Sequence, residues 1–120
     1  MILIKRAYEA AKAADGKRFL VDRLWPRGVS KEKLELTAWV KDAAPSNELR
    51  QWYHHDLTQW DEFRRRYTGE LEANPEAWKP LVAAARKGKM TLLYSSQHTD
   101  RNNAVVLKEF LEKRLGKKEV

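Results

Sequence analysis

Hydrophobic residues form short strand-like runs near both ends of the chain. Residues 2–8 alternate imperfectly and predict a strand, and residues 18–24 form a continuous apolar run typical of a buried strand. Residues 34–42 alternate in a way that favours a strand, with a helix as the alternative, and residues 90–94 predict the central strand. Nine residues separate the first two runs, fewer than the roughly twelve that a parallel crossover needs, so we expect these strands to be antiparallel if adjacent.

The middle of the chain and its C-terminal part have helical spacing. The pattern runs from residue 46 to the end of the seventies, with cap signals at Asp56 and Asn74, and a further helix follows Asn74. The last helix is capped by Asp100 or Asn102 and ends at Gly116. These elements predict an α/β fold: a single compact domain over residues 1–120, with a small mixed sheet of three to four strands flanked by about four helices.

Both strand-like runs that end in polar groups are expected to lie side by side. Residues 19–23 and 90–94 are short, unbroken apolar segments, and each leads into a cluster of polar side chains. In open α/β sheets ligands bind outside the carboxyl ends of the strands. We therefore expect two neighbouring buried strands with a ligand site at their ends.

Composition narrows the class of protein. The chain has 120 residues, 42% hydrophobic and 34% charged, as in one folded domain. The absence of cysteine excludes thiol nucleophiles, thiolate zinc sites, iron–sulfur clusters and disulfides. No apolar run reaches the length of a secretory leader or the ~20 residues of a membrane span, so we expect a cytoplasmic protein with no membrane association.

The first polar cluster covers residues 22–28. Arg23 and Arg27 stand four residues apart around a proline and a glycine, and two planar guanidinium groups in such a turn can converge on one phosphate or carboxylate. The alternative is structural: Arg23 pairs with a buried carboxylate, Trp25 packs, and Arg27 is solvated.

The second polar cluster covers residues 94–103, which read as a strand end, a polar turn and the start of a helix. A helix N-terminus offers unpaired N–H groups to an anion, and Ser95 and Ser96 add hydroxyls. A serine at such a turn is similar to a nucleophile elbow, but the flanking glycines are missing. The alternative is capping of the helix by these polar side chains.

Two other features of the sequence are candidate sites. Adjacent helical residues such as His54 and His55 point ~100° apart, and nothing in the sequence brings His98 to them, so we expect no metal site and no cofactor. The tryptophans at helical spacing are expected to pack in the core rather than to stack on bases.

The net charge is +7, from 24 Lys and Arg against 17 Asp and Glu. It is spread along the chain, with local clusters at 64–66, 86–89 and 113–118. Solvated helix faces are the main interpretation: Arg64 should border the core face of its helix, while Arg65 and Arg66 point to water. A nucleic-acid surface is the alternative, and it requires the three clusters to share one face.

Several motifs together resemble a known family. The segments are Asp15-Gly16, Leu20 to Gly28, Ser30-Lys31, Ala44 to Arg50, Trp52, His55-Asp56, Trp60, Phe63, Tyr67, Glu70-Leu71, Thr91 to Tyr94 and Asn103 to Leu107. In this order they resemble the YeaO-like family, Domain of Unknown Function 488, over nearly the whole chain. The resemblance implies a compact bacterial-type cytoplasmic α/β domain and no established activity. Family members commonly carry an acid after the last strand and a histidine in the last helix, where this chain has Ser95 to His98 and Asn102-Asn103.

Our leading hypothesis is a pocket for a small anionic ligand, bearing a phosphate or a carboxylate, between the 22–31 loop and the 94–103 turn. The alternatives are a basic nucleic-acid-binding module and an interaction domain without chemistry. The residues expected in the pocket are Asp22, Arg23, Trp25, Arg27, Lys31, Tyr94, Ser95, Ser96, His98 and Asn103.

Overall fold

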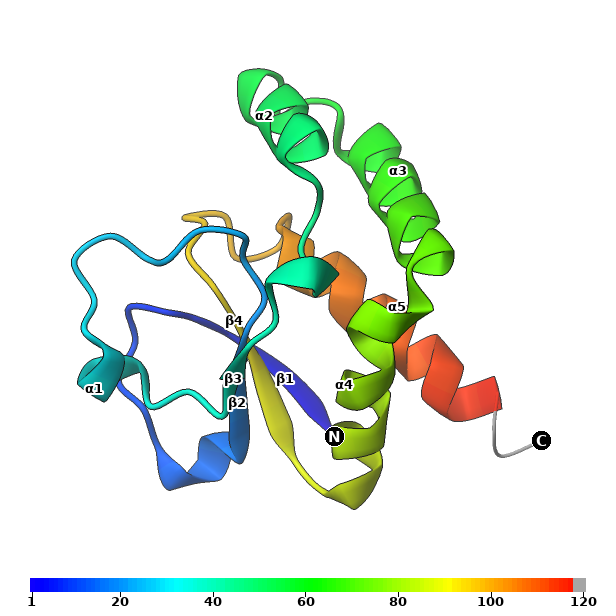
Figure 1. The fold of residues 1–120 in the computed structure, drawn as a ribbon. Coiled ribbons are helices and arrows are strands. Elements are labelled where there is room, and N and C mark those ends of the chain that lie inside the picture. Colours follow the sequence, from blue (N-terminus) through cyan, green and yellow to red (C-terminus); the bar gives the residue numbers. More distant parts are fainter. Residues whose placement is uncertain (118–120) are drawn as a thin grey trace.

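The computed structural model describes residues 1–117, which form one α/β domain with a four-stranded sheet. Figure 1 shows this sheet with helices around it. Its strands are β1 (Ile2–Arg6), β2 (Lys17–Leu20), β3 (Ala38–Trp39) and β4 (Met90–Tyr94). The helices are α1 (Lys31–Leu34), α2 (Asn47–His55), α3 (Trp60–Ala73), α4 (Pro75–Lys87) and α5 (Asn103–Lys117), with short 3-10 turns at Ala13–Asp15 and Lys41–Ala43. The α/β class and the number of strands are as the sequence predicts.

The sheet is parallel throughout, in the order β1-β4-β2-β3. The expected pairing of the buried runs is confirmed: Phe19 lies opposite Leu92, and Leu20 opposite Leu93. The expectation of a mixed sheet is wrong, because β4 inserts between β1 and β2. These two strands are therefore not adjacent, and the short connection between them does not force an antiparallel pair.

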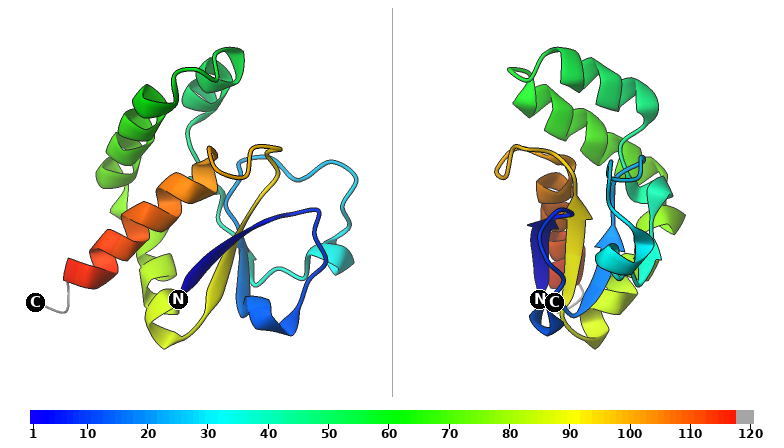
Figure 2. Two further views of the ribbon diagram at one scale, coloured as in Figure 1. Left: turned by 180° about the vertical axis from the view of Figure 1, so that it is seen from behind. Right: turned by 90° about the vertical axis from the view of Figure 1, so that its left-hand side faces the viewer.

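The alternation of side chains along β2 and β4 divides the core between the two faces of the sheet. Phe19 and Leu92 point into the larger cluster, which includes residues of α3, α4 and α5. Leu20 and Leu93 point into a smaller cluster formed with Val29 and neighbours from the 25–39 segment. Figure 2 shows the same division, with α1 and its loops on one side of the strands and α5 on the other.

The segment 34–42 departs from the predicted strand. Ser30 caps a helical turn by accepting a hydrogen bond from the Lys33 N–H, so α1 begins at Lys31 and includes Leu34. Glu35 has a positive φ of 46° and ends this turn. Only Ala38 and Trp39 pair with β2, because a 3-10 turn follows directly.

Helices α2, α3 and α4 occupy the region with helical spacing. Ser46 caps α2 by accepting from the Leu49 N–H, and its own hydroxyl donates to Glu70 on α3. Asp56 ends α2 and holds a turn by accepting from Thr58, so α3 starts only at Trp60. Within residues 1–117, no helix is long and apolar enough to cross a membrane.

A buried ionic cluster forms around Asp15, just before β2, and joins β1 to β2. Asp15, 5% exposed, accepts hydrogen bonds from the Lys5 ammonium and from the Arg18 guanidinium, whose Nε donates to the Leu34 carbonyl. Burial alone would raise the pKa of Asp15, but hydrogen bonds from the Lys12 N–H, Lys5 and Arg18 outweigh burial and lower it. The ionised carboxylate therefore contributes to stability.

Acid should weaken the protein through Asp15. Because the folded-state pKa lies below the ordinary value of 3.8, the unfolded chain binds this proton more readily. The stabilisation is complete above that ordinary value and is lost as the pH falls through the lower folded-state pKa. In urea unfolding from about pH 7 to about pH 2.5, Asp15→Asn should be less stable at neutral pH, and its deficit should narrow with acid. A deficit independent of pH would contradict this role.

Gly16 follows Asp15, and only glycine fits this position, because its backbone has a positive φ and there is no room for a Cβ atom. Its φ is 65°, and a Cβ there would overlap the carbonyl oxygen of Lys89, which accepts the Lys17 N–H. Gly16→Ala should destabilise the protein by at least about 2 kcal/mol in chemical unfolding. Gly69 on α3 has open space around it, so Gly69→Ala is the control and should stabilise the protein by about 0.5–1 kcal/mol. Equal effects of the two changes would refute the steric argument.

Candidate functional site

The carboxyl ends of β2 and β4 are tied together by one side chain, Asp22. Its Oδ2 accepts hydrogen bonds from the Ser95 N–H at 2.9 Å and from the Ser95 hydroxyl at 2.7 Å. Its Oδ1 accepts from the Asn103 amide at 3.0 Å, and that amide also donates to the Val21 carbonyl. The carboxylate therefore joins the end of β2, the end of β4 and the start of α5.

The turn between β4 and α5 is held by its own polar groups. The Ser96 hydroxyl accepts from the His98 N–H, and the Asn102 amide donates to the His98 carbonyl. Asn102 also caps α5 by accepting from the Val105 N–H at 3.0 Å, which makes it the cap among the two candidates. The N-terminus of the 15-residue α5 thus starts beside the carboxyl edge of the sheet.

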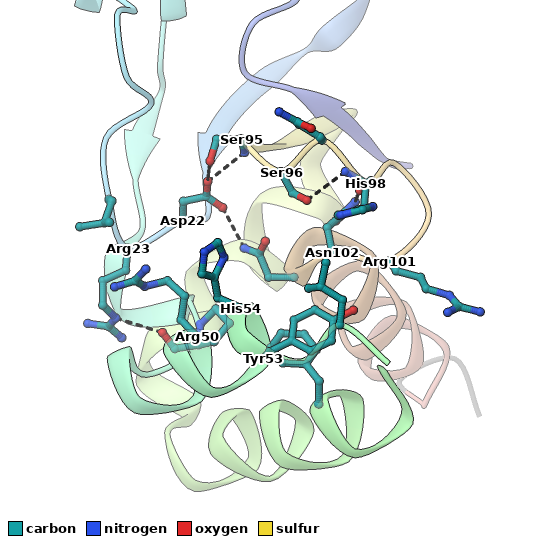
Figure 3. Close-up of a pocket in the computed structure, with 16 residues that line it drawn as sticks. Asp22, Arg23, Arg50, Tyr53, His54, Ser95, Ser96, His98, Arg101 and Asn102 are labelled. Carbon is teal, nitrogen blue, oxygen red and sulfur yellow. Dashed lines mark hydrogen bonds between the residues drawn. The ribbon is translucent and has the colours of Figure 1, made fainter. Parts of the chain in front are cut away.

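A pocket of about 520 Å³ opens at this edge. Its walls come from the segment after β2, from the β4–α5 turn and from α2, which stands over the carboxyl edge in Figure 1. Figure 3 shows the side chains that line it. They are Asp22, Arg23, Leu24, Pro45, Arg50, Tyr53, His54, Leu57, Phe63, Ser95, Ser96, Gln97, His98, Arg101, Asn102 and Asn103.

Three arginines and one carboxylate are among the residues that line the pocket. In the view of Figure 3, Arg23 and Arg50 lie on one side of the pocket, and Arg101 lies on the other side with its side chain pointing outward. Within residues 1–117 no carboxylate lies within 4.0 Å of any of the three. Asp22 is the single carboxylate on the wall among the described residues, so the three arginines give the pocket an excess of positive charge. The Asp22 carboxylate already accepts three hydrogen bonds.

The three arginines differ in what they bind. Arg23 donates to the backbone carbonyls of Pro45 and Ala44, so it pairs with carbonyls rather than with the buried carboxylate of the structural alternative. Within the described chain the side chain of Arg50 donates no hydrogen bond, and its Nε is buried. Arg101 is exposed at the mouth of the pocket. The half-buried Arg50 therefore has donors that the fold does not use.

Tyr53 marks the apolar wall of the pocket. Its ring stacks on Phe63 with centroids 4.3 Å apart. Burial raises the pKa of the Tyr53 phenol, and the nearby charge of Arg101 partly offsets this effect. The phenol therefore remains protonated near neutral pH and is a hydrogen-bond donor on this wall.

The structure brings six of the ten expected site residues to the pocket. These are Asp22, Arg23, Ser95, Ser96, His98 and Asn103. The indole of Trp25 donates to the Val29 carbonyl and packs edge-on against Trp39, which agrees with the packing alternative. Tyr94 is buried on β4, and Arg27 and Lys31 are exposed residues that do not line the pocket.

The sequence analysis missed the wall that α2 provides. Arg50, Tyr53 and His54 follow a helical i, i+3, i+4 spacing, so they share one face of α2, and Leu57 follows just after the end of this helix. This spacing is visible in the sequence, but the face carries both polar and apolar side chains, which is also the pattern of a helix face exposed to solvent.

Within residues 1–117 no group of three His, Asp or Glu side chains is placed to hold a metal ion.

The Arg64 to Arg66 run is largely paired within the protein. Arg64 pairs with Glu109 on α5, while Arg65 and Arg66 both pair with Glu62. Their side chains are 43%, 74% and 50% exposed, so Arg64 borders the core as predicted. Lys118 of the last basic cluster lies outside the described residues. The nucleic-acid alternative stays a prediction.

Comparisons with known proteins point to one family. A family model described as the inactive DUF488-N3 subclade matches residues 1–119. The uncharacterised protein YeaO of Escherichia coli (strain K12) is 44% identical over 110 residues, which cover 92% of this chain and 96% of YeaO. An uncharacterised protein of Mycobacterium tuberculosis (strain H37Rv), Rv3073c, is 39% identical over 113 residues, which cover 94% and 95% of the two chains. No solved structure matches significantly.

Removing the Asp22 carboxylate should loosen the carboxyl edge of the sheet. Asp22→Ala leaves the donors of Ser95 and Asn103 without their acceptor, and the expected loss of unfolding free energy is about 2–3 kcal/mol. Asp100 is exposed in the same turn, so Asp100→Ala is the control and should change stability by less than about 0.5 kcal/mol. Urea unfolding of both variants measures the difference. Equal stability of the two would show that Asp22 does not tie these segments.

Proposed function

Because the chain belongs to the YeaO-like DUF488 family, in the subclade described as inactive, we propose that it binds a small anionic ligand without converting it. The ligand bears a phosphate or a carboxylate and occupies the pocket between residues 22–24, α2 and the 95–103 segment. The observation that carries this proposal is the guanidinium of Arg50, which lines the pocket and whose donors are not used within the described chain. Guanidinium groups match the planar geometry of carboxylate and phosphate oxygens.

The surroundings of Arg50 support an anion rather than a cation. Arg23 and Arg101 add positive charge to the same pocket, and Asp22 directs both of its oxygens to Ser95 and Asn103. The start of α5 adds the positive end of a helix dipole. Each of these features favours a negative group.

The arrangement of the serines supports binding without reaction. The Ser95 hydroxyl donates to Asp22, and the Ser96 hydroxyl accepts from the His98 backbone N–H. Within residues 1–117 no imidazole is hydrogen-bonded to either hydroxyl, so neither serine has the histidine base of a serine hydrolase. Incubation with phenyl phosphate should therefore release no phenol, and catalytic release would contradict this part of the proposal.

Inorganic phosphate should raise the melting temperature in a saturable manner, with one site per chain in calorimetry. Arg50→Ala removes one charge-assisted contact and should weaken phosphate binding by at least about tenfold. Arg101→Ala is a second variant that leaves the fold intact, because Arg101 is exposed, and it should weaken binding as well. Arg27 is also exposed but does not line the pocket, so Arg27→Ala is the matched control and should bind like the parent protein.

A loss of phosphate binding in Arg27→Ala, with normal binding in Arg50→Ala and Arg101→Ala, would show that the anion binds elsewhere and would refute this pocket.

The nucleic-acid alternative is tested by titrating the unaltered protein with a DNA oligonucleotide at increasing salt concentration. A slope of several units in a plot of log affinity against log salt concentration would favour the nucleic-acid alternative, provided that the double variant Arg65→Ala, Arg66→Ala has a smaller slope.

A further inference from the structure

The pocket exposes large apolar side chains as well as charges. Among the described residues the exposed large hydrophobic side chains are Met1, Tyr8, Leu24 and Leu57. Leu24 is 57% exposed and Leu57 is 42% exposed, and both line the pocket. Two solvated leucines at the rim of one concave site are unfavourable in the absence of something that covers them.

These leucines belong to different walls. Leu24 follows Asp22 and Arg23 at the end of β2, whereas Leu57 lies just after the C-terminal end of α2. The stacked rings of Tyr53 and Phe63 lie on the same pocket and continue the apolar surface inward. The cationic groups and the apolar groups therefore line one connected space.

We infer that the ligand is an amphipathic anion, in which a phosphate or carboxylate is attached to an aromatic or aliphatic body. This inference rests on the proposed function and specifies its ligand class. The charged group binds at the arginines, and the body covers Leu24, Leu57 and the Tyr53 ring. Tyr53 lines the same pocket and adds a phenolic donor for an oxygen of the ligand.

The dimensions of the site fit a small molecule. A volume of about 520 Å³ lies within the usual range of ligand pockets, ~300–1,000 Å³. A free inorganic ion would fill only a small part of this space and would leave both leucines in water. The body of an amphipathic ligand removes that apolar surface from water, and this burial adds affinity beyond the charge.

Calorimetric titrations with matched pairs of probes separate the two contributions. Inorganic phosphate is compared with phenyl phosphate, and acetate with benzoate, so that the members of each pair share the charged group and differ chiefly in the size of the apolar body. The aromatic member should bind at least about tenfold more tightly than its partner. The comparison between the two pairs shows whether the charged group is a phosphate or a carboxylate.

Variants locate the apolar body. Leu24→Ser and Leu57→Ser should each reduce the advantage of the aromatic probe several-fold and leave binding of the inorganic ion or acetate unchanged. Both leucines are exposed, so these variants are expected to fold. Tyr8 is 38% exposed and outside the pocket, and Tyr8→Ser is the matched control that should change neither probe.

The outcomes distinguish this inference from the proposed function. If the aromatic probe binds no more tightly than its non-aromatic partner in either pair, the inference is overturned. The proposed function still stands in that case if Arg50→Ala weakens binding of the probes. An aromatic advantage that persists in both Leu24→Ser and Leu57→Ser would also overturn the inference, because the body would then bind elsewhere. Failure of all four probes to bind would overturn the proposed function and the inference together.

Discussion

The pairing of β4 on both of its edges is the constraint on which the rest of the molecule depends. All five residues of this strand are buried, and both of its neighbours run parallel to it. A parallel sheet directs the carboxyl ends of its strands to one edge, so the segments that follow β2 and β4 emerge together. The polar clusters after these strands are therefore brought together by the sheet, although more than seventy residues separate them in the chain.

At that edge the negative and positive groups have different tasks. The Asp22 carboxylate is used within the fold, since it satisfies donors of the β4–α5 turn and of α5. Arg23 is fixed by backbone carbonyls, whereas Arg50 on α2 has no hydrogen-bonding partner for its side chain in the described chain. Among the described residues three arginines and one carboxylate line the pocket, so its net charge is positive, and this charge supports the proposed anion binding.

The pocket also shows why its residues were only partly predictable. Residues directly after a buried strand, such as Asp22 and Ser95, could be assigned because strand ends meet in a parallel sheet. Arg27 and Lys31 were expected from their closeness in sequence, but the chain turns away after Leu24 and places them on the surface. The contribution of α2 depends on the angle at which a helix leaves the sheet edge, and local spacing carries no information about that angle.

The sequence by itself determined the class of fold, the buried strand 90–94 and the N-terminal caps of α2 and α5, because periodicity and hydrogen-bonding side chains act over a few residues. The expected cap at Asp56 and the expected helix end at Gly116 were wrong, because Asp56 ends α2 and α5 continues to Lys117. It also indicated that Asp22 and Ser95 lie together at the carboxyl edge of the sheet. Only the tertiary structure decided that β4 separates β1 from β2 and that 34–42 is mostly not a strand. Likewise, only the tertiary structure placed Arg50 opposite the β4–α5 turn. These features depend on contacts between segments that are far apart in the chain. The free energy of such a contact cannot be inferred from the residues of one segment alone.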